Sequence, residues 1–300
     1  MTLILEKPKH VVSLATSAVI VHHHMTVYTG KKSDDGVADE VSHGKGAQQR
    51  VGAWSHDLFV GDPDLRNLLN HRQTADNFIK RETYDWAGPL RLLEAVKLPT
   101  FMQQYDERIR QPFAGLLDKF MANYDDKVRN ALFKRGSLGK AEDYHSADYV
   151  RSRFTLDLNI MDVPSGDFRV SGVTDALLDD CRASFQQQTD RYIKELGQQQ
   201  LERLLDVMRS LAHCCDLETK VKADGTTQVV RRRLYDSTVE KAIAYCDEFQ
   251  RFNLAGNPEL EAARAALARA LDGVNVAALR ESDTLRANMK QEMDQILAKF

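Results

Sequence analysis

Two groups of basic residues are the strongest candidates for chemistry in this sequence. The first surrounds a predicted β-hairpin, residues 220–233, whose turn is Asp224-Gly225 and whose single acid is Asp224. Contacts to the phosphate backbone of a nucleic acid need such a local density of positive charge. The hairpin is therefore a candidate nucleic-acid surface, although runs of charge are more often simply solvated. Its cations are Lys220, Lys222, Arg231, Arg232 and Arg233.

The second group gathers near the end of a long predicted helix and includes two further candidate phosphate contacts, Arg151 and Arg153. Aromatic side chains lie close by in the sequence and are available to stack on bases. The other cations of this group are Lys127, Arg129, Lys134, Arg135 and Lys140, and the aromatic residues are Phe133, Tyr144, Tyr149 and Phe154.

Histidines of the N-terminal third are the nearest approach to a metal cluster. On a strand, His22 and His24 share one face, so both could ligate the same ion. The usual helical spacings of metal-binding histidines are missing, and Gly44-Lys45-Gly46 does not match a nucleotide-binding P-loop. No nucleophile elbow is present either. We therefore expect a non-enzymatic protein without cofactor or metal, and a metal-dependent activity of this histidine-rich region is the alternative.

Composition limits the class of protein. The 300 residues are 43% hydrophobic and 28% charged, enough for one large or two modest folded domains. The formal net charge of −3 gives no overall attraction to nucleic acid or anionic membrane, so such binding needs a local patch. The most apolar stretch, 11–21, is too short and too polar to cross a membrane. We expect a cytoplasmic protein with no membrane partner, whose four cysteines are reduced.

The chain is predicted to contain two regions. Residues 1–60 form a β-rich segment, because its branched and aromatic residues show no helical period, and 33–49 is a flexible loop within it. Residues 61–300 form a long-helix domain with strand or hairpin insertions near 154–170 and 220–233.

Helix boundaries can be predicted at several places. Asp62-Pro63 and Asn257-Pro258 are helix starts, and Ser237 with Glu240 has the spacing of a capping box. A helix opened by Leu98-Pro99 continues to about residue 132 with a kink at Pro112, after a possible short helix over 90–96.

The longest predicted helix covers 175–215, and the last covers 283–300. Long apolar stripes need partners of similar length. The predicted fold class is thus mainly α (α+β): an elongated antiparallel bundle of long helices or coiled-coil hairpins, with a small N-terminal β element and short β-hairpins.

Several ordered features carry a family resemblance that spans nearly the whole chain. They are the strand leading into Tyr28-Thr29-Gly30-Lys31-Lys32, the opening Lys97-Leu98-Pro99, and Tyr149 to Phe154 followed by Val163-Pro164. With the long C-terminal helices, the chain resembles an uncharacterised family of phage and integrative-element proteins. Its members are encoded beside a MoxR-type AAA+ ATPase and a protein with a von Willebrand A domain. The resemblance implies an accessory partner of that machine in DNA replication or recombination, and it transfers no catalytic residue.

Three functions follow as hypotheses. The first is the non-enzymatic phage-type partner of an AAA+ ATPase and von Willebrand A system, acting in the host cytoplasm. The second is a protein that binds nucleic acid, single-stranded DNA in particular, through the basic hairpin. The third is a structural or assembly protein of a virion or filament, in which the long helices would join copies of the chain.

Overall fold

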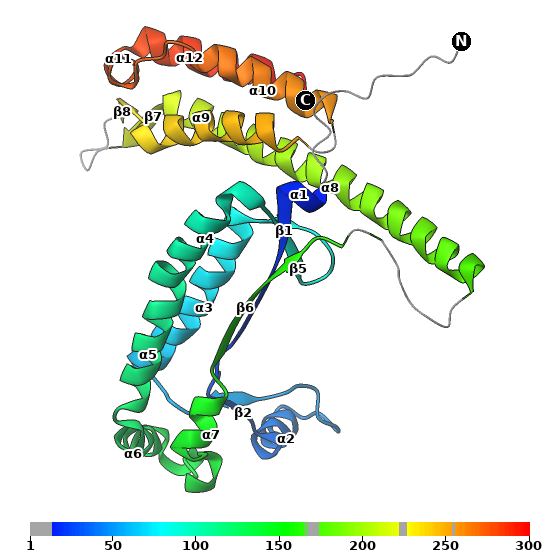
Figure 1. Cartoon of the computed structure of the whole chain (residues 1–300). Helices are drawn as coiled ribbons and strands as arrows, with labels where there is room; N and C mark the ends of the chain where they lie inside the picture. The colour runs from blue at the N-terminus through cyan, green and yellow to red at the C-terminus, as the bar shows by residue number, and fades with distance from the viewer. Residues whose placement is uncertain (1–13, 165, 167–173, 222–226, 254–255) are drawn as a thin grey trace. The chain divides into compact units, whose positions relative to one another are not determined.

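The structure is a computed structural model that describes residues 14–164, 166, 174–221, 227–253 and 256–300. The chain divides into two compact units (Figure 1). Residues 19–161 form the sheet unit, and the described residues of 14–18 and 162–300 form the helical unit. The expected boundary lay between residues 60 and 61. It differs from the observed one because strands far apart in the sequence pair with each other, which keeps residues 19–161 together.

A four-stranded sheet organises the sheet unit. Its order is β4-β5-β1-β6, formed by Tyr84–Asp85, Leu90–Glu94, Ala18–Thr26 and Thr155–Asp162. The predicted strands near the N-terminus and near residue 154 are confirmed. The predicted short helix over 90–96 is wrong, since β5 pairs antiparallel with β4. β5 lies between β4 and β1 in the sheet, and pairing with strands elsewhere in the chain is not visible in the local spacing of apolar residues.

A second, two-stranded sheet pairs β2 (Lys31–Ser33) with β3 (Ser55–Asp57) antiparallel, with Lys32 opposite His56. Between them lies α2 (Asp35–Gly44), where a flexible loop was expected. That prediction is wrong: Asp34 caps the helix by accepting a hydrogen bond from the Val37 amide at 3.0 Å. With this cap, a few small apolar residues at helical spacing are enough for the helix to form, and Ala38 is the one that is buried in the core.

Helices α3 to α7 complete the sheet unit. α3 (Pro63–Glu82) starts as predicted, because the Asp62 carboxylate accepts hydrogen bonds from the amides of Asp64 and Leu65, each at 2.9 Å. The predicted helix from residue 98 is confirmed as far as Met121, where α4, a π-helical turn that ends two residues before Pro112, and α5 follow one another without a gap. Its continuation to residue 132 is wrong, because the helix breaks at 122–123 and α6 starts afresh at Tyr124. The segments are Leu98–Tyr105, Asp106–Arg110, Gln111–Met121 and Tyr124–Arg135, followed by α7 (Ala147–Ser152), which was predicted as a short helix.

The π-helical turn is tied to the neighbouring helix by a buried histidine. His71 of α3 donates from Nε2 to the carbonyl of Ile109 at 2.9 Å and stacks on Phe113. A π turn shifts the backbone pairing by one residue, so a side chain can satisfy the displaced carbonyl.

Five helices make up most of the helical unit. α8 (Asp175–Cys215) is continuous over 41 residues, and α9 (Asp236–Arg251), α10 (Pro258–Leu271) and α12 (Asp283–Leu297) pack on it. α11 (Val276–Glu281) leads into α12. The buried side chains of α8 lie in its second half, where Leu196, Leu204, Met208 and Leu211 are fully buried.

The helical unit also contains short elements. The predicted basic hairpin is confirmed as strands β7 (Leu217–Val221) and β8 (Thr227–Arg231), paired from Leu217 opposite Arg231. Its Asp224-Gly225 turn, and the strand predicted near 168–170, lie outside the described residues. A four-residue helix, α1 (Leu14–Ser17), precedes β1. The fold is therefore mostly helical with small sheets. None of the helices described is both long and apolar enough to span a membrane.

Candidate nucleic-acid interface

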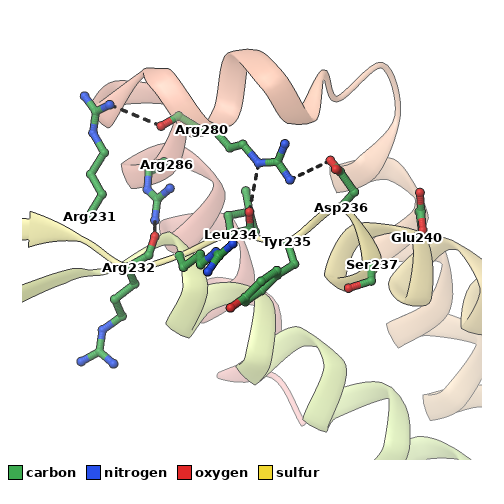
Figure 2. A pocket seen from close by; sticks show the side chains of 10 residues that line it. Arg231, Arg232, Leu234, Tyr235, Asp236, Ser237, Glu240, Arg280 and Arg286 are labelled. Carbon is green, nitrogen blue, oxygen red and sulfur yellow. Dashed lines mark hydrogen bonds and ion pairs between the residues drawn. The ribbon is translucent and has the colours of Figure 1, made fainter.

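The end of the basic hairpin opens into a pocket of 790 Å³ in the helical unit (Figure 2). Segments from β8, α9, α11 and α12 meet there. Five arginines line the pocket against two carboxylates, so its lining carries a net positive charge. The lining residues are Arg231, Arg232, Arg233, Leu234, Tyr235, Asp236, Ser237, Glu240, Arg280 and Arg286.

The three consecutive arginines do not form one continuous patch. Arg231 donates from Nε to Asp283 of α12 at 2.6 Å, while Arg232 donates from Nη1 to Nε2 of His213 of α8, also at 2.6 Å. Figure 2 shows these two side chains extending in opposite directions, as successive residues leaving a strand do. Each arginine therefore meets a different helix, which sequence spacing does not show.

Arg231 and Asp283 form an exposed ion pair. The hydrogen bond from Arg231 lowers the pKa of the Asp283 carboxyl, and Arg231 also donates to the carbonyl of Arg280 at 3.3 Å. Arg231 thus has part of its charge compensated.

Arg233, like Arg231, is exposed, but it has no carboxylate partner among the described residues. Its guanidinium lies 4.8 Å from the centre of the Tyr235 ring, a cation–π contact. Tyr235 is itself 49% exposed. Together they place a cation and an accessible aromatic ring at the pocket edge.

Two arginines of the pocket, Arg280 and Arg286, were not predicted from the sequence. Arg280 donates from Nε to the carbonyl of Leu234 at 3.0 Å and pairs with Asp236 at 2.9 Å. Arg286 is only 2% exposed; its Nη2 donates to the carbonyl of Arg232 at 2.6 Å and to that of Cys214, and its buried Nε has no partner. One signal was available: Arg286 interrupts the apolar stripe of the last helix, three residues before buried Met289.

The first turn of α9 also faces the pocket. The predicted capping box is wrong, because the helix starts at Asp236 and its N-cap is Tyr235, which makes no side-chain cap. Ser237 therefore lies inside the helix rather than before it. The positive end of a 16-residue helix thus adds to the basic character of the pocket.

The remaining predicted cations are dispersed. Lys222 lies outside the described residues, as does the side chain of Lys220, whose backbone pairs with Gln228. Arg151 and Arg153 belong to the sheet unit: Arg151 pairs with Asp118 at 2.7 Å, and Arg153 lies over the Tyr149 ring.

Most of the second basic group stabilises the sheet unit. Lys127 bonds Asp62 at 2.9 Å and Asp64 at 2.6 Å, so it joins α6 to the start of α3. Arg135 is buried against Asp143. These cations are already paired and do not form a free phosphate-binding surface.

The predicted histidine pair does not gather further ligands. His22 is partly buried and His24 exposed on β1, and no group of three potential metal ligands (His, Cys, Asp or Glu) is assembled within the described residues. His23 packs edge-on against Tyr105, and burial lowers the pKa of its imidazole.

No protein-family model matches the chain, and neither does any curated protein or solved structure. No relative therefore supplies site residues.

Proposed function

We propose that the chain is a non-enzymatic accessory protein of DNA metabolism whose helical unit binds the phosphate groups of nucleic acid through the arginine pocket. The observation that carries this proposal is the convergence of five arginines on one hollow, three from the end of the basic hairpin and one each from α11 and α12. Such a density of guanidinium groups suits phosphate contacts, which arginine makes with several donors at once.

Single-stranded nucleic acid is the form that the pocket edge favours. Exposed Tyr235 offers a ring on which an unpaired base can stack, and Arg233 beside it offers a phosphate contact. A base in a duplex is already stacked, so this combination selects for single strands.

Fluorescence anisotropy with a labelled single-stranded oligonucleotide at several salt concentrations tests the proposal. We expect replacement of Arg231, Arg232 and Arg233 by glutamine to weaken binding and to make the salt slope less negative by about 1 to 2, since each phosphate contact contributes roughly 0.7 for a single strand. The matched control is Arg209→Gln, an exposed arginine of α8 paired with Asp206. Absence of binding at low salt, or equal effects of the triple variant and the control, would reject the proposal.

A second candidate function is docking of a protein partner. The first half of α8, residues 175–195, has no fully buried side chain, and Leu177 and Cys181 of its apolar stripe are exposed. The family resemblance suggests as the occupant an AAA+ ATPase of the kind encoded beside members of that family. We expect the purified ATPase to bind the full chain and to lose affinity by about tenfold when Leu177 is changed to aspartate, since a charge in an apolar contact costs over 1 kcal/mol. Arg182→Gln, on a polar face of the same segment, is the control.

A further inference from the structure

We propose that the arginine pocket contains a discrete subsite for a terminal phosphate monoester, the dianionic group at the end of a nucleic-acid strand. The inference rests on the proposed function and deepens it by naming the group that the pocket recognises. The subsite lies between the first turn of α9 and the arginines of α11 and α12 (Figure 2).

The buried guanidinium of Arg286 is the first reason. A buried cation is costly unless an anion compensates it. Within the described residues no carboxylate lies within ion-pair distance of Arg286, whose Nη2 is held by two neutral carbonyls. The nearby carboxylate of Asp283 interacts with Arg286 electrostatically but forms its ion pair with Arg231. Its Nε is buried without a partner although the residue lines the pocket. An anion bound in the pocket would supply the missing negative charge.

The start of α9 is the second and independent reason. Its N-cap residue, Tyr235, provides no side-chain acceptor for the first-turn amides, and Asp236 and Ser237 line the pocket. Uncapped amides and the positive end of a helix form a favourable environment for a phosphate. Asp236 does not fill this role fully, because its carboxylate pairs with Arg280.

The balance of charge favours a dianion. Arg231 pairs with Asp283, and Arg280 pairs with Asp236. Three lining arginines remain, namely Arg232, Arg233 and Arg286, against one further lining carboxylate, Glu240. Two positive charges are therefore left over. A terminal monoester carries about two negative charges at neutral pH, whereas an internal phosphodiester carries one.

Two oligonucleotides of one sequence, with and without a terminal phosphate, test the subsite on the full chain. We expect the phosphorylated strand to bind about tenfold more tightly, as a charge-assisted contact of this kind provides. Separate 5′- and 3′-phosphorylated strands, and competition by inorganic phosphate, identify which source of the monoester the subsite accepts. A preference for at least one phosphorylated end supports the proposal.

Two variants separate a folding defect from a lost contact. Arg233→Gln, at an exposed position, is expected to remove most of the preference for the phosphorylated strand. Glu240→Gln removes a negative charge from the pocket and is expected to tighten binding of the phosphorylated strand by about two- to threefold. A gain of affinity cannot result from unfolding. Arg209→Gln is the control and is expected to leave the preference unchanged.

The outcomes distinguish the two proposals. If both strands bind equally, and neither Arg233→Gln nor Glu240→Gln changes their ratio, the subsite is rejected while nucleic-acid binding stands. If neither strand binds at low salt, the proposed function and the subsite fail together. If phosphate competes and Glu240→Gln strengthens the preference, the subsite is supported.

Discussion

Replacing Asp143 by alanine should destabilise the sheet unit by about 3–5 kcal/mol, the range observed when one partner of a buried ion pair is removed. Asp143 accepts hydrogen bonds from Arg135 at 3.1 Å and from Lys32. The side chains of Asp143 and Arg135 are only 2% and 3% exposed. Without Asp143, Arg135 keeps only uncharged acceptors, and its charge stays buried. Urea denaturation monitored by circular dichroism measures the loss.

The matched control is Asp118→Ala in the same unit. Asp118 pairs with Arg151 at 2.7 Å, but both side chains are more than half exposed. Solvent screens such a pair, so the expected loss is at most about 1 kcal/mol. Equal losses in the two variants would show that burial of the Asp143 pair does not determine its contribution.

The contribution of Asp143 should also depend on pH. Burial alone would raise the pKa of this carboxyl, but the hydrogen bonds from Lys32 and Arg135 outweigh it and hold the pKa below its ordinary value. A carboxyl with a depressed folded-state pKa stabilises the protein above its unfolded-state pKa. That stability is lost as the pH falls through the folded-state pKa. The difference between wild type and Asp143→Ala should therefore be constant near neutral pH and narrow below about pH 4.

Local signals in the sequence predicted much of the fold. Asp62-Pro63 and Asn257-Pro258 marked helix starts correctly, because a capping side chain and the following proline act within one turn. The same local logic failed at Ser237, where packing moved the helix start to Asp236. It also failed for 90–96, since pairing with another strand outweighs the propensity of so short a segment.

The sequence predicted only part of the candidate site, because tertiary packing decides which side chains meet there. A run such as Arg231 to Arg233 stands out in a sequence, but where each side chain points depends on the helices around it. Arg280 and Arg286 reach the pocket from about fifty residues further along the chain, and only tertiary packing brings them there. The density of charge along the sequence therefore located the basic hairpin, while the structure was needed to show which cations line the arginine pocket.

Replacing Phe120 by alanine should destabilise the sheet unit by about 3–5 kcal/mol, the usual cost of removing a fully buried phenylalanine ring. Phe120 is 0% exposed and contacts Phe59 and Phe154 edge-on, with ring centres 5.5 and 5.9 Å apart. These residues come from three distant parts of the chain, so the resulting cavity cannot be filled by a local shift. Thermal and urea denaturation should both report the loss.

Phe133→Ala is the control that tests how α6 is oriented. The ring of Phe133 is 89% exposed, although only thirteen residues separate it from Phe120. The helix breaks at 122–123, and the buried positions of α6 are Tyr124, Ala131 and Arg135, so Phe133 lies on the opposite face. Its removal should change the free energy of unfolding by no more than about 0.5 kcal/mol. A loss as large as that of Phe120→Ala would mean that α6 presents the other face to the core, and Arg135 could then not be the buried partner of Asp143.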